Sequence, residues 1–382
     1  MSNRYPTDDG ISRWSLFERI LYANSVLKSK KKLIVFIYNT PDASTFRYRA
    51  YNIHCALEES DEIKAIYFYN SEIDSVINII LKADFVTIVR VPWNITLEKM
   101  MFMVKKKNIP LIFDCDDLIF DIREIAFVAN TIRGDLENMI NYSSKIYMAA
   151  RYADFFTTTN SFLAKKIKDV FNKEVWIIPN GYNEEQFNKS VSLVENAQEK
   201  KTFKVGYFSG SPSHYNDLLC CVEEVKRFLD DFSETKFVIC GYMELPQCLH
   251  ELVRQDRVER LPFTDYLTLQ EYIHSVDINI APLIDNDFTS CKSELKFFEA
   301  ALVKVPTLAS PSYAFRHSIE HGKSGYLCKD SEWYNALMCL YIDKNKRTQV
   351  AEYAFNICAS KYGPQNICDI ASKVYMQILK RS

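Results

Sequence analysis

The chain has 382 residues, a length that predicts two or three domains. Hydrophobic residues make up 48% and charged residues 25% of it, which is the balance of an ordinary globular protein. The formal net charge of −2 argues against a nucleic-acid binder that works through a broad basic field. No apolar run approaches the roughly 20 residues that span a bilayer.

The 11 cysteines are scattered, and no CxxC pair occurs among them. This pattern favours reduced thiols over a disulfide or zinc framework. The polar N-terminus MSNRYPTDDG shows no secretory signal. Together these features predict a cytoplasmic protein.

The first half of the sequence alternates short β-branched and aromatic runs with segments of helix length. The runs are nearly continuous in apolar residues, so we expect both faces of the sheet to be covered. A series of this kind predicts a parallel, doubly wound sheet. The expected strands are Leu33–Tyr38, Ala65–Asn70, Phe85–Val91, Pro110–Cys115, Asp154–Thr159 and Val175–Asn180.

A polar stretch without periodicity, Asn188–Thr202, follows and is expected to link two domains. Gly181, shortly before it, suits the left-handed backbone of a turn into that linker. The alternation then restarts, and the tail from about Ser331 to Lys380 has helical periodicity. The expected strands of the second half are Phe203–Phe208, Lys236–Cys240, Arg257–Phe263, Ile278–Leu283, Val305–Ser310 and Gly325–Cys328.

Two doubly wound halves joined by a linker form a cleft in which the carboxyl ends of both sheets face each other. Ligands of such sheets bind outside the strand carboxyl ends, so functional residues are expected to follow the strands. Several polar clusters of this sequence occur there. One of them begins the stretch CKSELKFFEAALVKVPTLASP, residues 291–311.

This stretch concentrates its charges just before a buried strand. Glu294–Val303 is predicted as a helix with Ser293 as its N-cap. Ser293, Lys296 and Glu299 then share one face, and the helix start offers free N–H groups and a positive dipole end to a phosphate. The Glu299 carboxylate can accept from two neighbouring hydroxyls, as on a ribose. A bound nucleoside diphosphate and a solvated face with a Lys296–Glu299 pair both fit this spacing.

Four motifs in register carry a resemblance to a known family. They are IIPNGYNEEQF (177–187), VGYFSGSPSHYNDL (205–218), IAPLIDNDFTSCKSELKFFEAALVKVPTLAS (280–310) and IEHGKSGYLCKDSEWYNAL (319–337). With these motifs the chain resembles nucleotide-sugar glycosyltransferases of the GT-B fold, above all the retaining family 4, or group 1, enzymes. The resemblance covers roughly residues 152–363, and RYRAYN (47–52) and FDCDDLIFD (113–121) extend it weakly to the first half.

The resemblance implies an α/β protein with two Rossmann-like, doubly wound parallel-sheet domains facing a cleft. Residues 1–185 would hold the acceptor, 186–202 would form the linker and 203–360 would hold the nucleotide-sugar donor. A final helix, 361–382, is expected to return to the N-terminal domain. The implied reaction moves a sugar, with anomeric retention, to a hydroxyl of a glycan or lipid-linked acceptor. Bacterial capsule, lipopolysaccharide O-antigen or similar surface polysaccharide assembly is the implied setting.

Family members often carry a Glu-x7-Glu pair whose second glutamate holds the ribose hydroxyls, and Glu299 matches it. The first glutamate, which touches the donor sugar, is replaced by Cys291. This departure leaves the identity of the donor sugar open. Ser293, Glu294 and Leu295 match positions whose backbone N–H groups contact the diphosphate.

The family commonly keeps an arginine and a lysine for the diphosphate in the first turn of the second domain. Here that turn is SGSPSHYND, which has neither. Gly210, Ser211 and His214 are its donor-binding candidates; alternatively, His214 is an exposed residue beside a helix cap. Lys292 or Lys296 is predicted to supply the missing charge. Because this fold uses helix dipoles and basic side chains in place of a cation, we expect no metal and no cofactor besides the nucleotide-sugar co-substrate.

The acidic cluster FDCDDLIFD follows an expected strand at the cleft edge of the first half. Asp116 and Asp117 are the catalytic candidates, either to orient an acceptor hydroxyl or to stabilise positive charge on the donor sugar. In retaining relatives the leaving phosphate helps to take the acceptor proton, so a strong protein base is not required. Alternatively, Asp114 or Asp116 caps the following helix or pairs with an arginine such as Arg49.

The stretch NTPDASTFRYRAYN stands where many relatives carry a glycine-rich loop, and it contains no glycine. Arg47 and Arg49 are predicted to bind acceptor or phosphate instead, because a guanidinium matches phosphate in a planar, two-pronged way. Since the two alternate, only one is expected to face the cleft. An ion pair at a helix start is the alternative.

The predicted helix Ile11–Leu27 precedes a KSKKK run. An apolar face beside lysines can bind an anionic membrane surface, so peripheral association with the inner membrane is one expectation. Packing of the helix on the N-terminal sheet is the other. The residues concerned are Trp14, Leu16, Phe17, Ile20 and Leu21.

Two other functions fit the sequence. One is a glycoside phosphorylase of the same fold. The other is a non-catalytic relative that binds a glycan or scaffolds an assembly, which Cys291 and the glycine-free first loop favour. The retained Glu299 and the lysines at the helix start argue against it.

Overall fold

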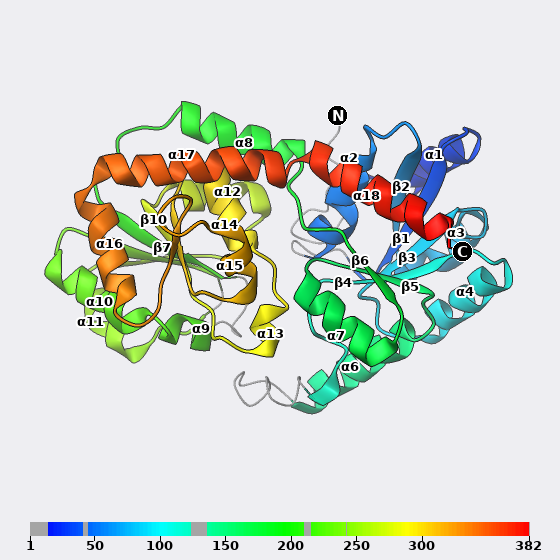
Figure 1. Cartoon of the computed structure of the whole chain (residues 1–382), viewed down its shortest axis with the longest axis horizontal. Coiled ribbons are helices and arrows are strands. Elements are labelled where there is room, and N and C mark those ends of the chain that lie inside the picture. The colour runs from blue at the N-terminus through cyan, green and yellow to red at the C-terminus, as the bar shows by residue number, and fades with distance from the viewer. Residues whose placement is uncertain (1–13, 41–44, 124–135, 210–214, 242, 382) are drawn as a thin grey trace.

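The computed structural model describes residues 14–40, 45–123, 136–209, 215–241 and 243–381. Figure 1 shows two lobes side by side, each a parallel sheet with helices on both faces. The inner strands are short and almost wholly buried, and in β1 only the first residue keeps appreciable exposure, whereas the edge strands β6 and β9 are partly exposed. This is the environment that nearly continuous apolar runs predict.

The N-terminal sheet is doubly wound, and all of its pairings are parallel. Its order, β2-β1-β3-β4-β5-β6, reverses between β1 and β3, as in the flavodoxin-type variant of this arrangement. The strands are β1 (Lys32–Tyr38), β2 (Ile63–Tyr69), β3 (Phe85–Val89), β4 (Leu111–Cys115), β5 (Phe155–Thr158) and β6 (Glu174–Ile177). The helices are α1 (Leu16–Leu27), the π-helical turn η1 (Arg47–Tyr51), α2 (Asn52–Leu57), η2 (Asn70–Glu72), α3 (Ile73–Ile80), α4 (Ile95–Lys106), α6 (Leu136–Ala150) and α7 (Ser161–Phe171).

The C-terminal sheet has the Rossmann order, β12-β11-β10-β7-β8-β9, which reverses between β7 and β10. Its strands are β7 (Lys204–Phe208), β8 (Lys236–Cys240), β9 (Val258–Leu261), β10 (Ile278–Ala281), β11 (Thr307–Ala309) and β12 (Tyr326–Leu327). The helices up to β12 are α8 (Glu184–Glu195), α9 (Tyr215–Leu219), α10 (Val222–Asp231), η4 (Gln247–Leu249), α11 (His250–Arg254), α12 (Tyr266–His274), α13 (Asp287–Ser290), α14 (Leu295–Leu302) and α15 (Tyr313–Ser318).

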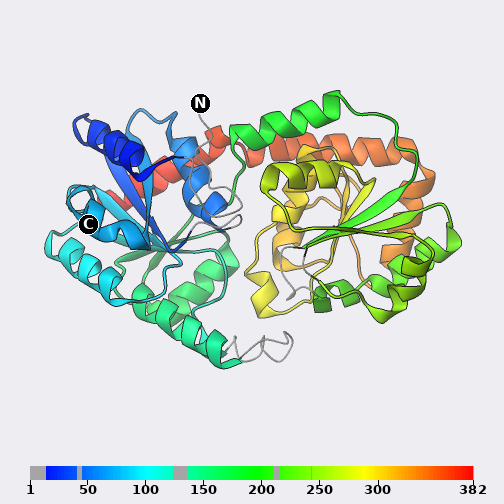
Figure 2. The ribbon, with the colours of Figure 1, turned by 180° about the vertical axis from the view of Figure 1, so that it is seen from behind.

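Three further helices follow β12 in the described residues: α16 (Glu332–Ile342), α17 (Lys344–Lys361) and α18 (Pro364–Leu379). Figures 1 and 2 show α17 lying along the C-terminal domain and α18 lying on the N-terminal one. Tyr375 of α18 is fully buried, packs edge-on against Phe36 and Phe85, and shares a hydrogen bond of 2.9 Å with the hydroxyl of Thr87. The end of the chain therefore ties the two domains together.

The structure corrects two expectations about the connection between the domains. The stretch predicted to be aperiodic contains most of α8, which packs against α12. Gly181 does not adopt a left-handed backbone; a Cβ there would lie 2.4 Å from Cγ1 of Ile367 and 2.8 Å from the carbonyl oxygen of Tyr362. Close packing against the start of α18, and not turn geometry, requires the glycine.

The apolar residues of α1 divide between the core and solvent. Trp14 is buried, and Leu16 and Ile20 pack against the N-terminal core. Phe17 and Leu21, one turn apart, are 67% and 53% exposed. Packing on the sheet thus buries part of the apolar helix face for which the sequence also allowed membrane binding. None of the described helices is long and apolar enough to cross a bilayer.

Candidate active site

Residues that follow strands of both sheets line one pocket of about 490 Å³. From the N-terminal domain they come after β1, β3 and β4, and from the C-terminal domain they come after β7 and β10 and from the start of α14. This is the position at which doubly wound sheets bind ligands. The charged lining residues are Arg47, Arg90, Asp116, Asp117, Lys292, Lys296 and Glu299.

Glu299 is bound from the opposite domain. Its Oε1 accepts a hydrogen bond from Nη2 of Arg47 at 2.9 Å and a very short one from the hydroxyl of Tyr48. Both donors belong to η1, and Glu299 is only 6% exposed. The alternative predicted from spacing, a solvated Lys296–Glu299 pair, is therefore not what the structure contains.

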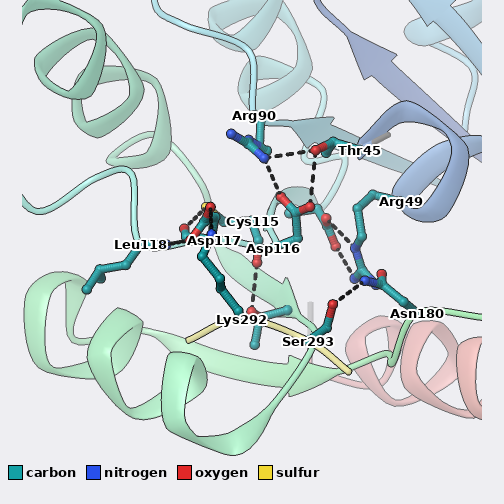
Figure 3. A network of polar contacts seen from close by, with 12 residues as sticks. Thr45, Arg49, Arg90, Cys115, Asp116, Asp117, Leu118, Asn180, Lys292 and Ser293 are labelled. Carbon is teal, nitrogen blue, oxygen red and sulfur yellow. Dashed lines mark hydrogen bonds and ion pairs between the residues drawn. The ribbon is translucent and has the colours of Figure 1, made fainter. Parts of the chain in front are cut away.

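Asp116 is bound by Arg90, a residue that the sequence reading did not single out. Nη1 of Arg90 donates to Asp116 Oδ1 at 2.9 Å and to Thr45 Oγ1 at 2.8 Å, as Figure 3 shows. Burial alone would lower the pKa of Arg90, but the neighbouring acidic groups, with Asp116 foremost, together outweigh it and the pKa is raised. The Arg90 backbone has φ of 49°, a left-handed conformation that costs about 1–3 kcal/mol outside glycine and clusters at functional sites.

Asp117 forms an ion pair across the cleft, 3.3 Å from Nζ of Lys292 (Figure 3). Burial would raise the pKa of Asp117, but Lys292, Arg90 and the backbone N–H of Leu118 together outweigh it, so the pKa lies below its ordinary value. The carboxylate is thus held ionised near neutral pH. A carboxylate of lowered pKa is a weak base, which suits orientation of a ligand better than proton removal.

Among the described residues, Lys296 is the charged pocket residue whose side chain has no hydrogen-bond partner. Its Nζ is shielded from solvent, lies 4.5 Å from the centre of the Tyr207 ring, and has no hydrogen-bond partner among the described residues. Burial lowers the pKa of Lys296 to about 8, against the opposing pull of Asp217. Burying an ammonium without a partner costs free energy. Lys296 lies in the first turn of α14, where the helix dipole also favours an anion.

The first turn of α14 differs from the prediction in detail. The N-cap is Glu294, without a side-chain cap bond, and Ser293 instead accepts from Nδ2 of Asn180 at 3.0 Å. Ser293 and Leu295 line the pocket. The Glu294 carboxylate accepts from the hydroxyl of Tyr362 at 2.7 Å, so its side chain serves the interdomain connection.

Arg49 is a structural residue, which corrects its assignment as an acceptor- or phosphate-binding group. It is fully buried and donates twice to Asp114, from Nε at 2.9 Å and from Nη2 at 2.7 Å. Its Nη1 donates to the carbonyl of Ile178 at 2.6 Å and to the side-chain oxygen of Asn180 at 3.1 Å. Of the two alternating arginines only Arg47 lines the pocket, and Asp114 takes the ion-pair role that the sequence left open.

Cys291 does not line the pocket. Its thiol is fully buried, and burial raises its pKa. Its carbonyl and that of Lys292 accept from Nδ2 of Asn160, which caps α7 of the opposite domain. The donor-binding candidates Gly210, Ser211 and His214 lie outside the described residues.

Sequence reasoning found eight of the pocket residues but missed three of their neighbours, Arg90, Tyr48 and Tyr207. The eight are Arg47, Asp116, Asp117, Lys292, Ser293, Leu295, Lys296 and Glu299. Tyr48 follows the expected strand Leu33–Tyr38, and that position is the signal that would have found it. Arg90 lay inside the expected strand Phe85–Val91, but β3 ends at Val89, so Arg90 follows the strand only in the structure. Tyr207 lies within a strand and has no such signal. No group of three or more potential metal-binding side chains occurs among the described residues.

Comparisons with known proteins concern first the C-terminal half. The family model described as Glycosyl transferases group 1 matches residues 202–343. No curated protein matches the chain significantly. The GT-B fold expected from the sequence is confirmed by solved structures of that fold, and so is the resemblance to group 1 glycosyltransferases.

Three solved structures illustrate this likeness. HepE of Anabaena, in complex with UDP and glucose, is 16% identical with a TM-score of 0.62 over 91% of this chain and 100% of that chain. Sucrose-phosphate synthase of Thermosynechococcus elongatus is 12% identical with a TM-score of 0.61 over 92% and 100%. The pneumococcal O-GlcNAc transferase GtfA, in complex with UDP and GlcNAc, is 15% identical with a TM-score of 0.55 over 77% and 57%. Identities this low show the fold alone.

Proposed function

We propose that the protein is a glycosyltransferase that moves a sugar from a nucleoside-diphosphate sugar to an acceptor hydroxyl in the cleft. The observation that carries the proposal is Lys296, whose buried ammonium lines the pocket without a partner among the described residues. Three ion pairs account for the other charged lining residues: Arg47 with Glu299, Arg90 with Asp116, and Lys292 with Asp117. One cation is left over, at a helix start, as an anionic diphosphate requires.

Glu299 lies one turn after Lys296 and completes the nucleotide site. The hydrogen bonds to it within the described residues end on Oε1. Its Oε2 can therefore accept from the two hydroxyls of a ribose. The solved structures of HepE and GtfA are complexes with UDP and a sugar, which supports the same class of ligand for this chain.

The bond that breaks joins the anomeric carbon to the β-phosphate, and the electron pair leaves with the phosphate. Lys296 and the α14 dipole stabilise the charge that develops on that phosphate. The acceptor proton goes to the departing phosphate oxygen, with the new bond on the same face of the sugar. The lowered pKa of Asp117, set by Lys292 and Arg90 against burial, supports this route because it makes Asp117 a poor base. Asp116 and Asp117 orient the acceptor.

The proposal includes a metal-independent reaction, since Lys296 and the helix start would supply the charge that a cation supplies elsewhere. Activity should therefore survive EDTA. Loss of activity in EDTA and its return with added divalent cation would refute this part of the proposal.

The acceptor is proposed to be a glycan or a lipid-linked saccharide in bacterial surface polysaccharide assembly, reached from the cytoplasmic face of the membrane. Exposed Phe17 and Leu21 on α1 stand before the lysine run, and α4 exposes Ile95 and Phe102 beside Lys99. Such surfaces bind anionic bilayers. The test is flotation with anionic liposomes, where binding lost in Phe17→Ser/Leu21→Ser supports the idea and absence of wild-type binding removes it.

The deciding experiment is calorimetric titration of UDP, GDP and dTDP into wild type, Lys296→Ala and Glu299→Ala. Binding of one nucleotide in the micromolar range, weakened at least tenfold in both variants, supports the proposal. Lys226→Ala is the matched control, because it removes the same charge from an exposed i,i+4 pair on α10 and should leave binding intact. No binding by any nucleotide to folded wild type would favour the non-catalytic alternative. Release of a sugar 1-phosphate from an oligosaccharide and inorganic phosphate would indicate a phosphorylase.

A further inference from the structure

Arg47 and Tyr48 of the opposite domain contact Glu299, and nucleotide binding alone does not explain these contacts. Arg47 Nη2 donates to the Tyr48 hydroxyl at 2.5 Å, and that hydroxyl donates in turn to Glu299. The Arg47 guanidinium lies 4.1 Å from the centre of the Tyr48 ring and 4.8 Å from that of Tyr266. The Tyr48 ring also packs edge-on against Phe298, at 6.0 Å.

These contacts join two domains. Arg47 and Tyr48 belong to η1, which follows β1, whereas Glu299 and Tyr266 belong to α14 and α12. Arg47, Tyr48 and Glu299 are 4%, 2% and 6% exposed. A buried carboxylate is stable only when hydrogen bonds compensate its lost hydration. Both bonds come from across the cleft, so the position of Glu299 depends on the N-terminal domain.

The two donors also keep Glu299 away from its own helix neighbour. Lys296 and Glu299 are three residues apart on α14, a spacing at which lysine and glutamate pair readily. Such a pair would consume both the free ammonium and the free carboxylate oxygen. Arg47 and Tyr48 hold Oε1 instead, and Lys296 Nζ stays unpaired among the described residues.

We infer that Tyr48 and Arg47 are positioning residues for donor binding: they fix Glu299 from the acceptor domain so that Glu299 reads the ribose while Lys296 remains open to the diphosphate. The inference rests on the proposed function. It makes the nucleotide site a two-domain site, in which nucleotide binding and closure of the cleft are linked.

The test is Tyr48→Phe, which keeps the ring and its packing and removes only the hydroxyl. UDP affinity is expected to fall about tenfold, which is about 1.4 kcal/mol, since the hydrogen bond that is lost has a charged acceptor. The specific readout is discrimination between UDP and its 2′,3′-dideoxy analogue. Wild type should prefer UDP strongly, and Tyr48→Phe should lose most of that preference, because a misplaced Glu299 no longer reads the hydroxyls.

Tyr152→Phe is the matched control. It also removes a tyrosine–glutamate hydrogen bond, of 2.6 Å to Glu98, but within the N-terminal domain and away from the pocket. It should leave both affinity and ribose discrimination unchanged. If Tyr48→Phe does not fold, Arg47→Gln takes its place with the same expected loss of discrimination.

The outcomes separate the two proposals. If wild type binds no nucleotide, the proposed function fails. If wild type binds UDP and Glu299→Ala loses it, while Tyr48→Phe and Arg47→Gln keep wild-type affinity and discrimination, the nucleotide site stands and the positioning role is wrong. A uniform loss of affinity for UDP and its dideoxy analogue, with discrimination retained, would likewise overturn the role.

Discussion

Nζ of Lys292, in the C-terminal domain, lies 3.3 Å from Oδ2 of Asp117, in the N-terminal domain. Both side chains are about one-fifth exposed, at 22% and 20%, so solvent weakens this ion pair to about 1 kcal/mol or less. An incoming diphosphate can therefore compete with Asp117 for Lys292. Lys296 has no such competitor hydrogen-bonded to it among the described residues.

The two ends of this ion pair should affect nucleotide binding in opposite directions. Lys292→Ala removes a cation and is expected to weaken UDP binding about two- to fivefold, much less than Lys296→Ala. Asp117→Asn removes a competing anion and should strengthen UDP binding by a similar factor, while transfer slows because the carboxylate no longer orients the acceptor. Calorimetry and sugar-transfer assays on both variants measure this. Weaker UDP binding in Asp117→Asn would contradict it.

Nucleotide affinity should depend on pH through Lys296. Burial lowers its pKa to about 8, so its ammonium is charged below that pH and loses its proton as the pH rises through it. UDP affinity is therefore expected to be full near neutral pH and to fall above about pH 8. In Lys296→Arg the guanidinium stays charged, and this fall should disappear. Calorimetric titrations between about pH 7 and pH 9.5 test it; equal slopes in both proteins would show that another group titrates.

Breaking the buried Arg49–Asp114 pair should cost stability. Arg49 is fully buried, and Asp114 is 2% exposed. Arg49→Met leaves an unpaired buried carboxylate and is expected to lower the free energy of unfolding by about 3–5 kcal/mol. Denaturant unfolding of the variant measures the loss. Arg123→Met is the control, because its pair with Asp121 lies on an 83% exposed arginine side chain. A change below about 1 kcal/mol in Arg49→Met would contradict a structural role.

Gly181→Ala should weaken the attachment of α18 to the N-terminal domain. The added Cβ would meet Ile367 and the Tyr362 carbonyl at distances that real Cβ atoms do not show, so the start of α18 must shift. We expect a destabilisation of about 1–3 kcal/mol. Gly322→Ala is a useful contrast, since its backbone is left-handed but no atom lies within 4 Å of a Cβ there. Limited proteolysis near residue 363 should be faster in Gly181→Ala and unchanged in Gly322→Ala.

The fold was largely predictable because its signals are local. Each expected strand is present within a few residues of its predicted bounds, and the helical tail is present as α16, α17 and α18. The helix α8 was missed because its polar composition hides its periodicity; it buries only Gln186 and Ser190. The N-terminal sheet order could not be predicted, since strand order depends on contacts between runs that are distant in sequence.

The candidate site was predictable where position along a strand or helix was enough. Lys296 and Glu299 share a helix face by spacing alone, and alternation correctly indicated that one of Arg47 and Arg49 faces the cleft. Which arginine it is depends on the π-helical turn η1, which spacing does not reveal. Ser293 was mistaken for a cap because its partner, Asn180, lies 113 positions away.

The sequence by itself determined where the strands lie, to within a few residues, and which chemical groups stand near the strand ends, because these follow from neighbouring residues. Only the tertiary structure decided how the charges pair. Arg47 and Glu299 are 252 positions apart, and Lys292 and Asp117 are 175 apart. Charges pair according to distance in space and to the water that burial removes. Within the described part of the chain, the unpaired ammonium of Lys296 can therefore be recognised only after its neighbours have been assigned to other partners.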